Sequence, residues 1–465
     1  GSNNTSVGSQ SLAANTTGTS NVALGKTAGA AITTGSRNIA IGHDAGASAT
    51  TVSDNTAVGY YALQDNTGAS NTAVGSYALL QNTTAANNTA VGYSAGVAIT
   101  TGATNTLLGS EAGLALTTGA SNVAIGSEAL KNEDGHGFNT AVGTQALFTQ
   151  NAGANAYNVA VGYQAGAGVT TGTENTLIGG LAGDALTVGN SNVAVGTHAL
   201  SADTKGDRNV AIGRAALQVQ NFTSTTDSYN TAVGYGAGEA VTTGIENTLI
   251  GGLAGDVLTD ADYNVAVGVY ALSADTKGNK SVAIGRAALA AQNFTSSTDS
   301  FNTAVGYHAG SNVTSGTGNT LIGGLAGDAI TTSADNTAVG YQALTTNTTA
   351  ANNTAVGVSA LKLTTTGANN TAVGRGTLLA NTTGVSNTAV GKSALAANTT
   401  GSNHTALGKD ALLVSTAGGY DTALGDSVLK ANTSGNYNTG VGASALAANT
   451  TASNNTAVGY AALTA

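Results

Sequence analysis

The stretch from Ala380 to Leu412 reads ANTTGVSNTAVGKSALAANTTGSNHTALGKDAL and gives nearly the same phrase twice. The phrase NTAVG has counterparts along the whole chain, and alignment on its last residue, the motif glycine, gives 27 copies from Gly8 to Gly459. Of the 26 intervals between motif glycines, 22 are 17 residues long, and the others are 16, 19 and twice 21 residues. A strict period below about 20 residues indicates a β-solenoid, because helical repeats need more than about 30 residues.

Each unit begins with a short segment rich in β-branched residues. Asparagine stands four residues before the motif glycine in 24 copies, the exceptions being Ser281, His404 and Asp421. Stacked in register, these asparagines are expected to hydrogen-bond from coil to coil through their amides and so to hold the register. The alternating β-branched residues that follow predict a strand. After the glycine come two variable residues, alanine, and then leucine or glycine, before a polar corner such as Ala397–Gly401. We therefore expect strand, tight turn, strand and wider turn, which is one coil of a narrow parallel β-roll.

A four-coil pattern divides the chain into two regions. Through Leu344, the residue four after the motif glycine runs leucine, glycine, glycine, leucine, and afterwards it is always leucine. We accordingly expect β-roll repeats with a four-coil super-repeat in residues 1–340 and simple 17-residue repeats in 341–465. Each set of four coils contains two that carry glycine at this fourth position. In the second of these two coils, four of the five sets have leucine instead of alanine two residues before the motif glycine. These pairs are Leu107 with Gly113, Leu177 with Gly183, Leu249 with Gly255, and Leu321 with Gly327. Such exchange of volume predicts that the two positions face one another inside the coil.

The other face of the predicted strand carries threonine or valine and an aliphatic residue in every coil. A strand that is apolar on both faces is normally buried on both. Exposed to water, the outward residues would form a stripe roughly 130 Å long at about 4.8 Å per coil. We expect identical stripes from other copies around an axis to cover it. The residues predicted at that axis include Val123, Ile125, Val193, Val195, Val210, Ile212, Val282 and Ile284.

Composition excludes several classes of function. Charged residues make up 8% of the chain, the net charge is −10, and no basic patch is evident, so a nucleic-acid partner is not expected. Without cysteine there is no disulfide or thiolate site, and no apolar run approaches the roughly 20 residues of a membrane span. The five histidines fall in separate coils, which predicts neither an enzyme nor a cofactor site. Glu133 and Asp134 are too few for a calcium cage, and no metal site is expected.

The units NTAVGYQAL (336–344), NVAIGSEAL (122–130) and SVAIGRAAL (281–289) resemble the head repeats of trimeric autotransporter adhesins, the YadA-like heads. Similar repeats occur in bacteriophage tail fibres. The resemblance covers essentially the whole chain, although the 17-residue period is longer than is usual in that family. It implies an all-β fold of left-handed parallel β-rolls, about 27 coils per chain, with three chains side by side. It also implies a homotrimeric extracellular rod, on a cell surface or a virion, that binds surfaces.

Aromatic residues are the candidate surface contacts. Tyrosine often follows the motif glycine directly, at Tyr60, Tyr93, Tyr163, Tyr235, Tyr307, Tyr341 and Tyr460. Exposed rings there could stack on sugars, or each ring could simply cover its neighbouring coil. The two longest intervals contain VQNFTSTTDSY (219–229) and AQNFTSSTDSF (291–301). Their aromatic pairs, Phe222 with Tyr229 and Phe294 with Phe301, could form a contact surface or fold back as a local plug.

These features predict an extracellular fibrous adhesin, or the shaft of a surface fibre, that attaches to cells or surfaces through many contacts on a rigid trimeric rod. Its partners are then itself, as a homotrimer or an end-to-end filament, and glycans or host-surface proteins. A purely structural filament or a virion tail-fibre shaft is the alternative. An ice-binding solenoid is a lesser one, because flat threonine arrays occur in such proteins.

Overall fold

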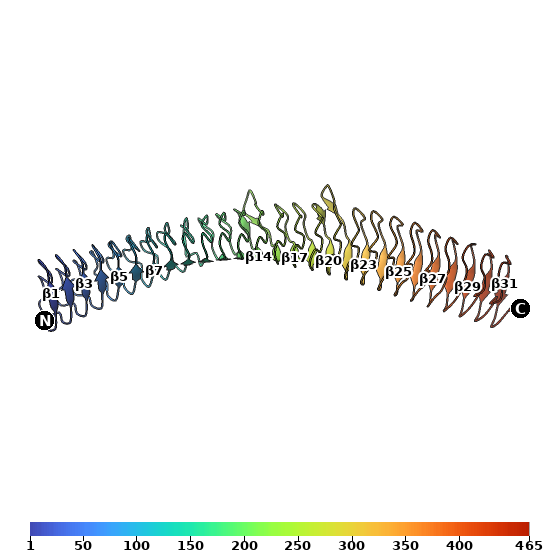
Figure 1. Ribbon diagram of the computed structural model, residues 1–465, viewed down its shortest axis with the longest axis horizontal. Helices are drawn as coiled ribbons and strands as arrows, with labels where there is room; N and C mark the ends of the chain where they lie inside the picture. Colours follow the sequence, from blue (N-terminus) through green and yellow to red (C-terminus); the bar gives the residue numbers. More distant parts are fainter. Residues whose placement is uncertain (465) are drawn as a thin grey trace. The chain divides into compact units, whose positions relative to one another are not determined.

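The computed structural model describes residues 1–464 as a parallel β-solenoid of about 27 turns without any helix (Figure 1). The chain forms two compact units, Gly1–Tyr235 and Gly236–Ala465. Each unit is a stack of coils, and each coil contributes one three-residue strand. The division does not coincide with the four-coil pattern, because that pattern runs on into the second unit.

The strands of the first unit are β1 (Thr5–Val7), β2 (Val22–Leu24), β3 (Ile39–Ile41), β4 (Thr56–Val58), β5 (Thr72–Val74), β6 (Thr89–Val91), β7 (Thr106–Leu108), β8 (Val123–Ile125), β9 (Thr140–Val142), β10 (Val159–Val161), β11 (Thr176–Ile178), β12 (Val193–Val195), β13 (Gly206–Asp207), β14 (Val210–Ile212), β15 (Thr226–Asp227) and β16 (Thr231–Val233). Those of the second unit are β17 (Thr248–Ile250), β18 (Val265–Val267), β19 (Gly278–Asn279), β20 (Val282–Ile284), β21 (Thr298–Asp299), β22 (Thr303–Val305), β23 (Thr320–Ile322), β24 (Thr337–Val339), β25 (Thr354–Val356), β26 (Thr371–Val373), β27 (Thr388–Val390), β28 (Thr405–Leu407), β29 (Thr422–Leu424), β30 (Thr439–Val441) and β31 (Thr456–Val458).

Within each unit, the three-residue strands pair in parallel with the strand one coil away. The register is residue for residue, as where Thr371 pairs with Thr388 and Val373 with Val390. In every three-residue strand except β1 the middle residue is buried, whereas neither of its neighbours is. The predicted alternation of inner and outer faces is therefore confirmed. The two-residue strands form separate pairs, β13 with β15 and β19 with β21, in which the second strand of each pair lies in one of the two longest intervals and the first lies in the coil before it.

The motif glycine lies where successive coils approach closely. Gly391 has φ 130°, and a Cβ atom built on it would lie 2.5 Å from the carbonyl oxygen of Gly408 in the next coil. Both the backbone conformation and the short separation require a residue without a side chain. This explains why glycine recurs here in all 27 coils.

The prediction of a second strand is wrong, because residues with left-handed backbone conformation recur at alternate positions after the motif glycine. Ser393, two residues after Gly391, has φ 60°, and Leu395 has φ 51°, so the segment forms turns. Its amide groups still bond to the next coil, as where the Leu395 N–H donates to the Ala411 carbonyl at 3.0 Å. Leucine in a left-handed conformation costs about 1–2 kcal/mol. Burial of its side chain contributes a similar amount, about 1.5–3 kcal/mol, which offsets this cost.

The predicted exchange of volume inside the coil is confirmed. A Cβ atom on Gly113 would lie 3.0 Å from Cδ2 of Leu107, and one on Gly96, a coil earlier, would lie 2.6 Å from Cδ1 of the same leucine. One leucine therefore fills the space left by two glycines, which explains why glycine coils come in pairs. The first set lacks this leucine, and at Gly46 the nearest atom is the Cβ of Ala40 at 3.7 Å.

A second exchange, which was not predicted from the sequence, occurs seven residues after the motif glycine. We call a coil a glycine coil or a leucine coil after the residue four places beyond its motif glycine. In glycine coils the seventh position is Ile99, Leu116 or another apolar residue, whereas leucine coils carry a polar residue there, such as Asn66 or Asn82. All four side chains are fully buried. A coil with glycine instead of leucine at the fourth position thus has an additional buried apolar side chain at the seventh position. The signal was present in the sequence as a covariation between the fourth and seventh positions.

The asparagines four residues before the motif glycine form a buried ladder through each unit. The N–H of Asn387 donates to Oδ1 of Asn370 in the preceding coil at 3.0 Å, and Asn387 Nδ2 donates to the carbonyl of Gly401 in the next coil at 2.9 Å. These bonds hold the register of neighbouring coils, as expected from the sequence. Ser281, His404 and Asp421 occupy the same place in the ladder and are equally buried.

Candidate functional site

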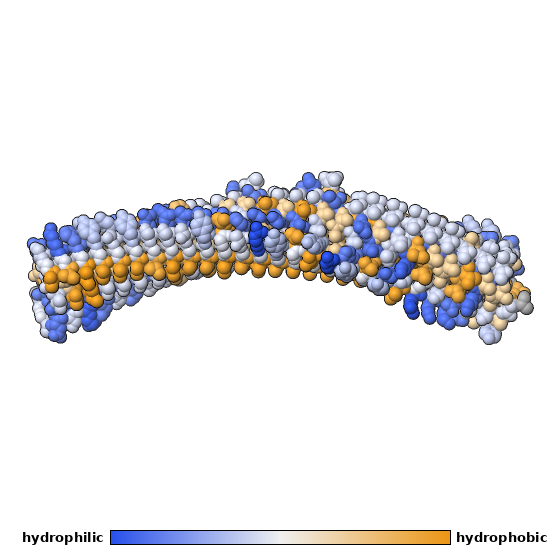
Figure 2. Space-filling view, in the orientation of Figure 1, coloured by the Kyte–Doolittle hydropathy of each residue, from blue (hydrophilic) through white to orange (hydrophobic). Residues whose placement is uncertain are grey.

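The first and third residues of each three-residue strand, here called the outward rows, line one face of every coil. Figure 2 shows hydrophobic atoms in a row that follows the coils of the N-terminal unit. Among the residues predicted at the trimer axis, Ile212 is 38% and Ile284 37% exposed. The other six, Val123, Ile125, Val193, Val195, Val210 and Val282, are half-buried. In a single chain these apolar side chains face water, and their burial by other copies stays a prediction.

The tyrosines that follow the motif glycine are exposed. Tyr60, Tyr93, Tyr163, Tyr235, Tyr307, Tyr341 and Tyr460 are all between 42% and 84% exposed. Several rings contact a neighbouring coil, as the prediction of a covering role requires. The ring centroids of Tyr60 and Tyr77 are 5.5 Å apart, and the guanidinium of Arg214 lies 5.5 Å from the ring of Tyr235. A sugar-binding role for these rings stays a prediction.

The two long loops divide their aromatic residues between inside and outside. Phe222 and Phe294 are buried, at 5% and 7% exposure, so they fold back as plugs, and the expectation that they form surface contacts is wrong. The Phe294 ring packs against the preceding coil, where a Cβ atom built on Gly278 would lie 2.7 Å from its Cδ2. Their partners, Tyr229 and Phe301, are exposed and lie beside a cation. The exposed half of each pair remains a candidate contact.

Stacked aromatic pairs lie just before the ladder residues, at positions that were not among the sequence-based candidates. Phe138 stacks on Tyr157 with centroids 5.2 Å apart, and Tyr420 stacks on Tyr437 at 5.1 Å. The second pair borders an open groove of about 420 Å³ that Asn403 and other polar residues also line. The signal that would have found them is an aromatic residue five before the motif glycine in two successive coils.

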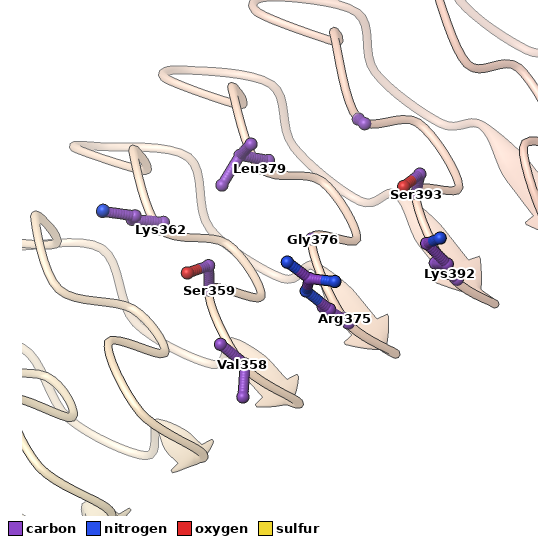
Figure 3. Close-up of a pocket in the computed structure, with 9 residues that line it drawn as sticks. Val358, Ser359, Lys362, Arg375, Gly376, Leu379, Lys392 and Ser393 are labelled. Atoms are coloured by element: carbon purple, nitrogen blue, oxygen red, sulfur yellow. The ribbon is translucent and has the colours of Figure 1, made fainter.

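A second groove, the basic groove, crosses three successive coils of the second unit (Figure 3). Its volume is about 410 Å³, and Lys362, Arg375 and Lys392 are among its lining residues, beside Leu379. Arg375 and Lys392 are exposed and form no ion pair within the described residues. No aspartate or glutamate occurs from residue 336 to 409. The expectation that the chain has no basic patch is therefore wrong at this place.

The groove arises because three cations fall on one side of stacked coils. Arg375 and Lys392 directly follow motif glycines, so the 17-residue period places them one above the other. Lys362 belongs to the preceding coil, and its Nζ points away from Arg375 (Figure 3) and donates to Oε1 of Gln342, one coil further back, at 2.9 Å. Like charges at this spacing repel one another. The groove therefore favours an anionic ligand that bridges several coils.

A corner of the first unit brings together three candidate metal ligands. Glu133, Asp134 and His136 each offer one ligand atom, and these atoms all lie within 4.8 Å of one another. The sequence pattern indicated the two carboxylates but not the histidine beside them. Burial raises the pKa of Glu133, although the backbone groups of His136 and Ala152 lower it in part.

Two titratable residues stand in successive positions of the asparagine ladder. His404 and Asp421 are buried, with Nδ1 of the histidine 3.5 Å from Oδ2 of the aspartate. Burial lowers the pKa of His404 to about 4 and raises the pKa of Asp421 to about 6. Both side chains are fully buried, although their sequence neighbours Asn403 and Tyr420 line the open groove described above.

Comparison with known proteins found no matching protein-family model and no similar curated protein. The geometry therefore defines the class of protein by fold, as a β-solenoid repeat protein. Among the described residues, none belongs to a helix long and apolar enough to cross a membrane.

Proposed function

We propose that this chain forms the shaft of an extracellular adhesive fibre, in which three copies meet along their outward rows. The single observation that supports this assembly most is the exposure of aliphatic side chains in coil after coil. The third residue of every three-residue strand is aliphatic, and none of these residues is buried. Soluble monomers rarely expose a continuous apolar surface of this extent.

A closed arrangement of identical chains is the simplest way to cover the rows. Each row repeats once per coil, so copies in the same axial register present matching surfaces to one another. Association along the rows also leaves the rest of each coil's surface free. The exposed tyrosines and the basic groove would then serve for contact with a target.

Attachment in this proposal depends on many weak contacts. Repetition places similar corners at regular intervals, and several contacts on one rigid body raise the overall affinity far above that of one contact. The basic groove suits carboxylated or sulfated glycans, because its cations lack acidic neighbours. The resemblance to adhesin heads supports the same function.

The molar mass of the full chain in solution, measured by light scattering after size-exclusion chromatography, tests the assembly. We expect three times the chain mass of 44.7 kDa. The double variant Val195→Lys with Ile212→Lys should give monomers, because it places charges in the outward rows. Thr197→Lys is the matched control, since residue 197 is exposed and directly follows a motif glycine, as Lys392 does.

Other masses would change the proposal. A monomeric wild-type chain would contradict the trimer and favour a single-chain solenoid. Its threonine and aliphatic face would then be tested for ice binding by thermal hysteresis. A mass that grows with concentration beyond the trimer would favour the purely structural filament. If the trimer forms, binding to arrays of acidic and neutral glycans tests the adhesive part separately.

A further inference from the structure

Glu133 differs from every residue at the equivalent place in the other leucine coils. Seven residues after the motif glycine, those coils carry asparagine, aspartate, glutamine, threonine or serine. The Glu133 side chain is fully buried, and its Oε1 accepts a hydrogen bond from the N–H of His136 at 3.0 Å. Its Oε2 is also buried and has no hydrogen-bond partner, although the backbone of Ala152 also interacts with this carboxylate. A buried carboxylate oxygen without a partner is costly.

The chain contains matched coils in which this cost is removed. Asp203 occupies the same place, and its Oδ1 accepts the N–H of Gly206 at 2.9 Å while Oδ2 accepts Nε2 of Gln220 at 2.7 Å. Gln150 corresponds to Gln220 in the coil after Glu133, yet its Nε2 has no partner. The glutamine that satisfies the aspartate therefore does not satisfy the glutamate. Oε2 of Glu133 remains available to a ligand.

The neighbours of Glu133 supply two further donor atoms. Nδ1 of His136 lies 3.5 Å from Oε1 of Glu133, and this nitrogen is buried without a hydrogen-bond partner. Asp134 is exposed and contributes a carboxylate oxygen within the same 4.8 Å cluster. Metal-ligand bonds of about 2.0–2.2 Å bring tetrahedral ligands to about 3.4 Å from one another, so small side-chain rotations close the site.

We propose that Glu133, Asp134 and His136 bind one divalent first-row transition ion of the Zn²⁺ type. Imidazole nitrogen with carboxylate oxygen is a donor set that suits such ions, whereas Ca²⁺ prefers six or more oxygens. The exposed side of Asp134 leaves room for water as a fourth ligand. The ion would compensate the buried negative charge and tie the corner of this coil together.

Isothermal titration of the full-length chain with ZnCl₂, and separately with CaCl₂ and MgCl₂, tests the site. We expect one Zn²⁺ per chain and a much weaker response to the other two ions. Glu133→Gln keeps an oxygen to accept the His136 N–H but removes the charge, and His136→Ala removes the nitrogen. Each should weaken Zn²⁺ binding at least tenfold. The matched control His308→Ala, at a half-buried position of another coil, should leave it unchanged.

Two results would overturn the proposal. One is the absence of Zn²⁺ binding to a chain whose circular dichroism shows a folded β protein. The other is binding that survives unchanged in Glu133→Gln and His136→Ala. Binding of Ca²⁺ in preference to Zn²⁺ would contradict the assigned class of ion. Since the variants leave the outward rows intact, these outcomes are independent of the trimer.

Discussion

At the scale of single residues, the buried asparagine ladder accommodates a titratable side chain but favours its neutral form. His404 and Asp421 each replace an asparagine without breaking the coil-to-coil bonds. The His404 N–H donates to Oδ1 of Asn387 at 3.0 Å, and Oδ1 of Asp421 accepts the N–H of Asn438 at 2.8 Å. Burial then shifts the pKa of each group in the direction that favours its neutral form.

The two shifts act on stability in opposite directions. The pKa of His404 falls from 6.5 to about 4, so the unfolded chain binds more protons and stability rises with pH across that window. The pKa of Asp421 rises from 3.8 to about 6, so the folded chain holds the extra proton and stability falls as pH rises through that window. A shift of about two pKa units corresponds to about 3 kcal/mol.

Restoring asparagine at either position should separate these effects. As pH rises from about 4 to about 6, the free energy of unfolding of His404→Asn should fall relative to that of wild type, because the variant lacks the histidine's gain. Over the same window that of Asp421→Asn should rise relative to wild type, because the variant lacks the aspartate's loss. Denaturant unfolding at several pH values measures both. Equal pH slopes in the two variants would show that these groups do not titrate as inferred.

At the scale of the coil, packing rests on compensation between inner positions. Leu107 fills the space beside both Gly96 and Gly113, and the fourth and seventh positions after the motif glycine exchange apolar volume. A narrow coil has room for only a few buried side chains, so a change at one position must be matched at another. The four-coil pattern is the sequence record of this constraint.

Gly113→Ala and Gly46→Ala form a matched pair that tests the compensation. Both glycines have left-handed backbone, with φ 59° and 57°, so the conformational cost is shared. Only Gly113 faces leucine methyls at 3.0 Å, whereas Gly46 has open space to 3.7 Å. We expect Gly113→Ala to be more destabilising by about 1–2 kcal/mol, since overpacking costs this much.

Hydrogen exchange of the amides in each coil measures this difference locally. The additional variant Leu107→Ala should remove most of the extra cost of Gly113→Ala, because the methyls that crowd the new Cβ are gone. Equal effects of the alanine substitutions at 113 and 46 would contradict the assigned packing.

The basic groove is a property of three successive coils, and its charges can be tested together. The double variant Arg375→Gln with Lys392→Gln should reduce binding of heparin, used as a probe of acidic glycans, at least tenfold. Rising salt should weaken the wild-type interaction, as screening requires. Lys26→Gln is the control, because Lys26 also follows a motif glycine but the adjacent coils carry no lysine or arginine at that place. Equal loss in the control would assign the binding to net charge alone.

At the scale of the whole molecule, local stacking and association of chains contribute separately to stability. Each coil bonds to its neighbours, so stability grows roughly as a sum of similar interfaces. The outward rows lie outside these interfaces and remain in water in one chain. Association would add a contribution that depends on protein concentration.

The thermal unfolding midpoint should therefore rise with concentration for the wild-type chain. In Val195→Lys with Ile212→Lys, the midpoint should be lower and independent of concentration. Differential scanning calorimetry over a hundredfold range of concentration provides the measurement. A wild-type midpoint that does not move would argue against the trimer, whatever the mass at one concentration.

The sequence by itself determined the coil number, the position of each three-residue strand, the asparagine ladder and the facing of Leu107 and Gly113, because a short, nearly constant period repeats the same local interactions in every coil. Only the tertiary structure decided the rest. It showed turns with left-handed residues in place of the second strand, since a left-handed backbone conformation after the motif glycine does not change the pattern of hydrophobic residues. It also buried Phe222 and Phe294, and brought together His136 with Glu133 and three cations in one groove. Those features depend on where coils place their corners in space, which spacing along the chain does not show.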